Sequence, residues 1–161
     1  MTGALGMTAN EVSEMLLERT AQAMLSGDFE GFAHCFALPH LIDTPDKKMT
    51  LNTRDALYDL FRQMVQGYKS RNVTALIRYC EVAEFRAPDR VEATHISHVM
   101  SNHQRVIDPF HTFSVIQFID NRWQLTSSQY AVDAQSHISA ALLGTFDCKT
   151  ALAPQHADTA I

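Results

Sequence analysis

The first half of the chain carries apolar residues at three- and four-residue steps, which is the spacing of amphipathic helices. Thr8-Ala-Asn-Glu11 has the form of a capping box, and Gly27 can adopt a left-handed conformation, so we predict a helix over about 9–26. Asp28 can cap a second, shorter helix that extends to Phe36. A third helix has the clearest apolar stripe in the sequence, formed by Leu57, Leu60, Phe61, Met64, Val65 and Tyr68.

The rest of the chain is typical of strands. Residues 44–48 form a turn between two short apolar runs, which predicts a short hairpin before the third helix. After Asn72 the hydrophobic spacing shortens to two residues, and Asp120-Asn121 is suited to a two-residue hairpin turn. We predict long strands over about 73–86, 91–101, 110–119 and 122–132, followed by a helical turn or two within 134–143.

This order of elements predicts an α+β fold: a cone in which three helices cover the concave side of a strongly curved, mostly antiparallel sheet. Such a cone encloses a cavity wherever the helices do not fill it. We expect a flexible N-terminus (1–8), a single cone domain (9–143) and a loose C-terminal tail (144–161). The 161 residues, 46% of them hydrophobic, are enough for one domain with a sizeable core.

Charge and hydropathy remove several classes of function. Thirteen Lys and Arg residues stand against eighteen Asp and Glu residues, a formal net charge of -5, so we expect no nucleic-acid partner. The N-terminal segment lacks a secretory signal, and no apolar run approaches the roughly 18 residues of a membrane-spanning helix. We therefore expect a cytoplasmic protein with no membrane partner.

Four segments, taken in order, carry a resemblance to a known family. They are Leu25-Ser-Gly-Asp-Phe-Glu-Gly31, Phe36-Ala-Leu-Pro39, Thr53-Arg-Asp-Ala-Leu57 and Ile119-Asp-Asn-Arg-Trp123. Over about residues 9–132 the chain resembles the nuclear transport factor 2-like (NTF2-like) superfamily, which includes SnoaL-like polyketide cyclases, ketosteroid isomerase, scytalone dehydratase and many binding or assembly modules. The resemblance implies the cone fold. It does not name a reaction, because enzymes and non-enzymes share this fold.

The resemblance to ketosteroid isomerase places the proton-transferring carboxylate of that enzyme at Asp43. A carboxylate at the rim of an apolar cone is a base of useful strength, because desolvation disfavours its ionised form. The alternative is an Asp that caps the turn at Thr44-Pro45-Asp46. The isomerase's oxyanion-binding Tyr and protonated Asp correspond here to Thr20 and Ser114, whose hydroxyls are weaker donors, so we do not expect steroid isomerisation.

His95 is the second catalytic candidate, because the resemblance places it with Ser97 on the concave face of the sheet. With a pKa near neutrality and Asp43 in the same pocket, it would suit a dehydratase or cyclase. The alternative is a hydrogen-bonded histidine on a half-polar sheet. Because His95 and His98 point to opposite faces, we expect no metal, and no other cofactor is predicted. The pocket is expected to be lined by Thr20, Phe36, Phe61, Ser97, Thr112, Ser114 and Trp123.

The opposite, convex face of the same strands is too apolar for a surface exposed to water. It is predicted to carry Ile96, His98, Met100, Phe113 and Val115. An apolar patch of this kind marks an interface, so we expect a homodimer through the convex face, in line with the superfamily. The alternative is a monomer that tolerates these residues singly.

Two functions remain open from the sequence. The first is a SnoaL-like domain that binds a small, mostly apolar organic molecule, with acid–base isomerase, cyclase or dehydratase chemistry at Asp43 and His95. The second is a non-catalytic, dimeric module for ligand sensing or assembly.

Overall fold

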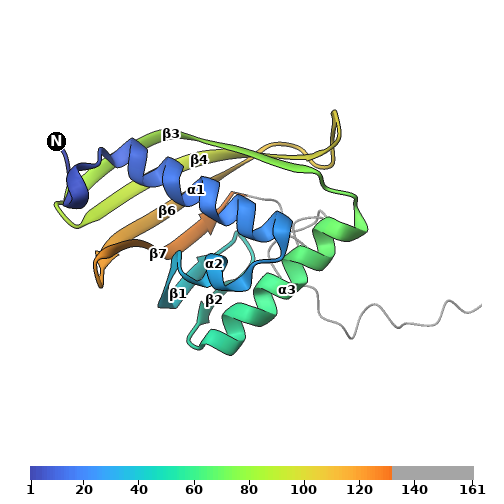
Figure 1. The fold of residues 1–161 in the computed structure, drawn as a ribbon, viewed down its shortest axis with the longest axis horizontal. Helices are drawn as coiled ribbons and strands as arrows, with labels where there is room; N and C mark the ends of the chain where they lie inside the picture. Colours follow the sequence, from blue (N-terminus) through green and yellow to red (C-terminus); the bar gives the residue numbers. More distant parts are fainter. Residues whose placement is uncertain (132–161) are drawn as a thin grey trace, which may run out of the picture.

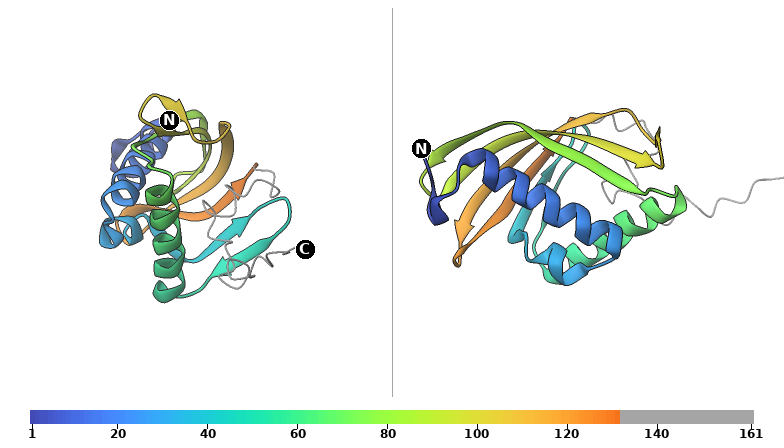
Figure 2. Two further views of the ribbon diagram at one scale, coloured as in Figure 1. Left: turned by 90° about the vertical axis from the view of Figure 1, so that its right-hand side faces the viewer. Right: turned by 45° about the horizontal axis from the view of Figure 1, so that its top comes forward.

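Three helices lie on one side of a curved, open sheet in the computed structural model, which describes residues 1–131 (Figures 1 and 2). This is the predicted α+β cone. A short 3₁₀ turn, η1, comes before the helices. The elements are η1 (Ala4–Gly6), α1 (Ala9–Ser26), α2 (Phe29–Ala33), β1 (Phe36–Asp43), β2 (Lys48–Leu51), α3 (Arg54–Ser70), β3 (Ala75–Ala87), β4 (Arg90–Ser101), β5 (Gln104–Arg105), β6 (Phe110–Ile119) and β7 (Arg122–Tyr130).

Local signals fix the ends of α1 as predicted. The Thr8 hydroxyl accepts a hydrogen bond from the Glu11 backbone, and the Glu11 carboxylate accepts one from the Thr8 backbone. Gly27 ends the helix with a φ of 74°. Glycine adopts this left-handed conformation at little cost because it has no side chain. Helix α2 is shorter than predicted, because the chain is already extended at Phe36, the first residue of β1.

The sheet has the strand order β2-β1-β7-β6-β4-β3, so the short β1–β2 hairpin belongs to the same sheet as the long strands. Neighbouring strands are antiparallel except β1 and β7, which are parallel. Asp120 and Asn121 both have positive φ, as expected for the tight turn that joins β6 to β7. The two-residue strand β5, which pairs with β4, was not predicted from the sequence.

Burial along β4 alternates strictly, and the alternation separates the two faces of the sheet. Ala93, His95 and Ser97 are buried on the concave side, whereas Ile96 and His98 on the convex side are only partly buried. Strand β6 continues the pattern, with Thr112 and Ser114 buried and Phe113 exposed. The assignment of these residues to faces is therefore as predicted.

Two buried clusters pack the helices against the sheet, and residues of both clusters line the cavity described below. One joins α2 and α3 to β1, β2 and the end of β4 around Phe32, Leu57 and Phe61. The other joins the first half of α1 to the middle of the sheet around Val12, Val91 and Trp123. The two clusters hold the helices against the sheet and do not fill the cone completely.

Several predictions concern the ends of the chain. Residues 1–8, expected to be a flexible N-terminus, contain η1, and Ala4 and Met7 contact the cluster around Trp123. The expected helical turns within 134–143 and the expected tail at 144–161 lie outside the described residues.

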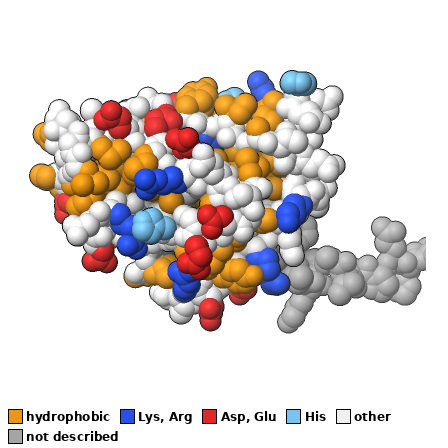
Figure 3. All heavy atoms as spheres, viewed as in Figure 1, with side chains coloured by type: hydrophobic (Ala, Val, Ile, Leu, Met, Phe, Trp, Pro, Cys, Tyr) orange, Lys and Arg blue, Asp and Glu red, His pale blue; other side chains and the backbone are white. Residues whose placement is uncertain are grey.

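No helix within residues 1–131 is long and apolar enough to cross a membrane. On the face shown in Figure 3, acidic and basic side chains are interspersed, and neither charge forms one large patch.

Candidate functional site

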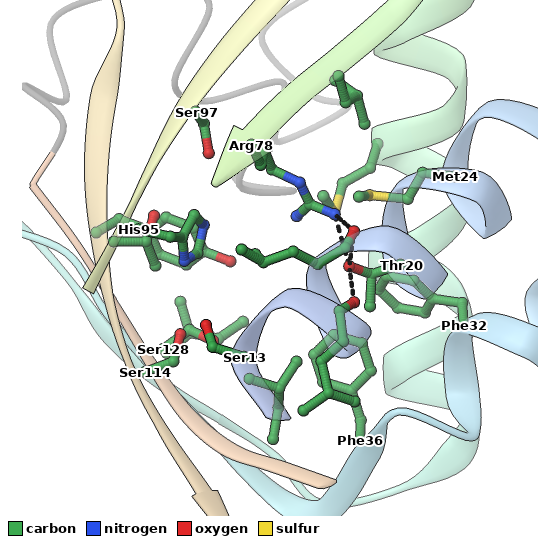
Figure 4. Close-up of a pocket in the computed structure, with 18 of the residues that line it drawn as sticks. Ser13, Thr20, Met24, Phe32, Phe36, Arg78, His95, Ser97, Ser114 and Ser128 are labelled. Atoms are coloured by element: carbon green, nitrogen blue, oxygen red, sulfur yellow. Dashed lines mark hydrogen bonds between the residues drawn. The ribbon is translucent and has the colours of Figure 1, made fainter. Parts of the chain in front are cut away.

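A cavity of about 80 Å³ lies between α1, α3 and the concave face of the sheet (Figure 4). Its wall is mostly apolar, with side chains from α1, α3, β1 and every long strand. Polar side chains interrupt this wall in two places: along the sheet, and where β3 faces α1. The lining residues are Ser13, Leu16, Leu17, Thr20, Met24, Phe32, Phe36, His40, Ile42, Leu60, Met64, Tyr68, Leu76, Arg78, His95, Ser97, Val99, Phe110, Thr112, Ser114, Ile116, Leu125, Ser128 and Tyr130.

The polar part of the sheet wall is a row of neighbours set by strand register. His95 pairs with Thr112 across β4 and β6, and Ser114 pairs with Ser128 across β6 and β7. All four residues are buried. The Thr112 hydroxyl oxygen has no hydrogen-bond partner among residues 1–131. A hydrogen-bonding group is therefore available at the cavity wall.

Arg78 carries the positive charge of this site. It lies on β3, where Ile77 and Tyr79 on either side point outward and are about half exposed. Its Nη2 donates hydrogen bonds to the Thr20 hydroxyl (2.6 Å) and to the Leu17 backbone carbonyl of α1. Figure 4 shows the guanidinium group between Thr20 and His95. Burial lowers the pKa of Arg78, but an arginine side chain keeps its proton in proteins.

His95 is 7% exposed, so its imidazole lies almost wholly out of contact with water. Burial, together with the positive charges of Arg78 and His111, lowers the pKa of His95 to about 3. The near-neutral pKa expected from the sequence is therefore wrong, because that expectation included neither the depth of burial nor Arg78. At pH 7 His95 is a neutral imidazole that can donate one hydrogen bond and accept another.

A second buried histidine, His40 on β1, also lines the cavity. One of its ring nitrogens lies 3.2 Å from the Leu125 carbonyl oxygen, to which it must donate. The other ring nitrogen lies 3.2 Å from the Ser128 hydroxyl and therefore accepts its proton. Burial lowers the pKa of His40 to about 4. His40 is thus a neutral residue that orients Ser128 in the cavity wall.

Comparison with known proteins gives matches at the level of structure. Models of known protein families do not match the sequence, and neither do the sequences of curated proteins. An NTF-2-like protein of unknown function from Shewanella oneidensis matches with a TM-score of 0.58 and 11% identity, over 78% of this chain and 100% of that one. An NTF2-like protein with a cystatin-like fold from Novosphingobium aromaticivorans matches with a TM-score of 0.60 and 17% identity, over 84% and 88%.

A protein of unknown function with a cystatin-like fold from Nostoc punctiforme gives a similar result, with a TM-score of 0.60 and 16% identity over 84% of this chain and 97% of that one. The chain has the NTF2-like fold. At these identities the likeness establishes the fold and no activity. The resemblance seen in the sequence is confirmed to that extent.

Within this NTF2-like fold, Asp43 does not join His95 in the cavity. It is the last residue of β1, its carboxylate lies 3.5 Å from the Lys48 ammonium, and it borders a separate depression beside Phe113. The expectation that both residues line one pocket is wrong. The reason is the alternation of side chains along β1: His40 and Ile42 line the cavity, so Asp43, the residue after Ile42, lies on the opposite face of the sheet.

Two other expected lining residues also lie elsewhere. Phe61 is buried in the cluster around Leu57, and Trp123 in the cluster around Val91, so both are core residues. Thr20, Phe36, Ser97, Thr112 and Ser114 do line the cavity. No group of three His, Cys, Asp or Glu side chains within residues 1–131 is arranged to hold a metal ion.

Sequence reasoning missed Arg78 and His40. Arg78 could have been found from the same alternation that identified His95, because Leu76, Arg78 and Cys80 occupy alternate positions of one strand. A charged residue in that series points into the cone. His40 follows Pro39 in an irregular stretch of β1, where the sequence carries no comparable signal.

Proposed function

We propose that the cone cavity binds a small, mostly apolar organic molecule. The observation that carries the proposal is a mostly apolar cavity with two buried polar atoms in its lining residues that lack hydrogen-bond partners among residues 1–131: the Thr112 hydroxyl oxygen and the Arg78 Nε. Burying a hydrogen-bonding group without a partner costs free energy, which a ligand with matching groups would recover. A concave apolar site with a few convergent polar groups is the usual form of a ligand pocket.

The volume of the cavity limits the size of its ligand. One water molecule needs roughly 10–15 Å³ of such a cavity, so a cavity of about 80 Å³ accepts roughly five to eight water-sized groups. The proposal is therefore a ligand that places about that many non-hydrogen atoms inside the cone. A fused polycyclic molecule such as a steroid is too large.

Binding without acid–base catalysis fits this site best. Asp43 lies outside the cavity in an ion pair with Lys48, so it cannot act with His95 on one ligand. The pKa of His95 is about 3, so its neutral ring is a weak base at pH 7. Isomerase, cyclase or dehydratase chemistry by this pair of residues is therefore not part of the proposal.

A cavity-filling substitution tests ligand binding. Ser114 is buried on the cavity wall, whereas Ser127 on the neighbouring strand borders the depression on the opposite side of the sheet. Native mass spectrometry and thermal unfolding with a panel of small aliphatic and aromatic compounds should identify binders. Ser114→Leu is expected to abolish their binding, and Ser127→Leu to preserve it. Binders that tolerate Ser114→Leu, or a panel without any binder, would contradict the proposal.

The exposed residues of the convex face support a second candidate, an assembly module. Ile77, Tyr79 and Val82 of β3 are about half exposed, and Phe113 of β6 is 37% exposed. Surface side chains of this kind are common in subunit interfaces. This candidate predicts a homodimer that forms through the convex face and on which function depends. The oligomeric state of a Phe113 variant tests whether the dimer forms through this face.

A further inference from the structure

Arg78 is a partly buried cation without an acidic partner in the described chain. None of the ion pairs among residues 1–131 includes it, and no Asp or Glu lines the cavity. The ionisable groups that act on its charge are Tyr68, Tyr130 and Cys35. Burial raises the pKa of each of these groups, so all three are neutral at pH 7 and none balances the charge.

The hydrogen bonds of Arg78 position its guanidinium group but use only one of its three nitrogen atoms as a donor. Both of its bonds, to Thr20 and Leu17, are made by Nη2. The Thr20 hydroxyl accepts from Arg78 and donates onward to the Leu16 carbonyl oxygen at 2.7 Å, so Thr20 is fixed by α1. The Arg78 Nε is buried without a partner, and Nη1 makes no hydrogen bond within residues 1–131. An arginine held at one end, with donors left over, is preorganised to bind an anion.

Building on the proposed function, we propose that the ligand of the cone is a small monocarboxylate whose carboxylate group binds Arg78 and whose apolar part fills the cavity. A carboxylate balances the single positive charge. A phosphate monoester carries roughly 1.5 to 2 negative charges at pH 7, and no Lys or second Arg lines the cavity to balance the excess. The neutral His95 and the unpartnered Thr112 hydroxyl supply further donors.

The apolar part of such a ligand has a defined place. Leu16 of α1 and Leu60 of α3 are buried and line the cavity on its helical side, and Ile116 extends the sheet wall beyond Ser114. Six-carbon hexanoate has about the size that the cavity accepts. Hexanamide has nearly the same shape but no charge, so a comparison of the two isolates the contribution of the carboxylate.

Isothermal titration of the full chain with hexanoate and with hexanamide at pH 7 is the direct test. A charge-assisted hydrogen bond to a partly buried arginine is expected to make hexanoate bind roughly tenfold or more tightly than hexanamide. In Arg78→Met the affinity for hexanoate should fall to that for hexanamide, while hexanamide binding stays within about threefold of wild type. Arg105→Gln, at an exposed arginine of β5, should keep the wild-type preference.

Each other outcome is decisive. Equal binding of both probes by the wild-type chain overturns the carboxylate assignment and leaves the proposed function standing. Binding of neither probe, in a chain that binds other compounds at the site tested by Ser114→Leu, also overturns the carboxylate assignment. Binding of no compound at all contradicts the proposed function itself. The comparison in wild type remains informative if Arg78→Met fails to fold.

Discussion

Acidification should destabilise this protein through its two buried histidines. His95 and His40 have pKa values lowered to about 3 and about 4 in the folded state, against about 6.5 in an unfolded chain. Below pH 6.5 the unfolded state takes up protons that the folded state does not accept until the pH approaches the lowered values. Stability is therefore complete above pH 6.5 and is lost as the pH falls toward 4 and then 3.

The magnitude follows from the difference in proton binding between the two states. At pH 5 an unfolded histidine is almost fully protonated, whereas His95 and His40 in the folded state remain largely neutral. Integrated from pH 7 to pH 5, each residue lowers the free energy of unfolding by about 2 kcal/mol, and the two together by about 4 kcal/mol. This loss is a large fraction of the roughly 5–15 kcal/mol by which domains are stable.

Urea unfolding at pH 7 and at pH 5 measures the effect. The wild-type chain should lose about 4 kcal/mol between the two pH values, and His95→Gln should lose only about 2 kcal/mol, because one of the two buried groups no longer titrates. His103→Gln, at an exposed turn position, should behave as wild type. A wild-type chain that is equally stable at both pH values, or a pH difference unaffected by His95→Gln, would refute the reasoning.

Three further predictions concern assembly and packing. Phe113→Asp at the exposed convex face should convert a homodimer to a monomer in sedimentation velocity, with little change in thermal stability; a variant that remains dimeric would exclude this face. Gly27→Ala should lower the free energy of unfolding by about 1–2 kcal/mol in urea, because Gly27 has a φ of 74° at the end of α1; no change would mean that the helix end rearranges freely. Leu57→Ala should cost about 2–5 kcal/mol in the same assay, because Leu57 is 1% exposed within the core; a loss below 1 kcal/mol would indicate that the core closes around the missing atoms.

The sequence by itself determined the elements and the faces they present. The capping box at Thr8, the glycine at position 27 and the turn at Asp120-Asn121 act within a few residues, so their effects can be predicted without the rest of the chain. Alternation along β4 likewise put His95 and His98 on opposite faces of the sheet, and the family resemblance assigned His95 to the concave one. The order of helices and strands was then enough to predict the cone.

Only the tertiary structure decided which inward-facing residues meet. Arg78 contacts Thr20, which is 58 positions earlier in the chain, and His40 contacts Ser128, which is 88 positions later. The orientation of β1 in the sheet turned His40 and Ile42 into the cavity and therefore left Asp43, which the resemblance had assigned to it, on the opposite face. The charge balance of Arg78 and the neutral state of His95 depend on the groups that folding brings together and on the water that those groups exclude. The local spacing of residues in the sequence encodes neither the neighbouring groups nor the loss of water.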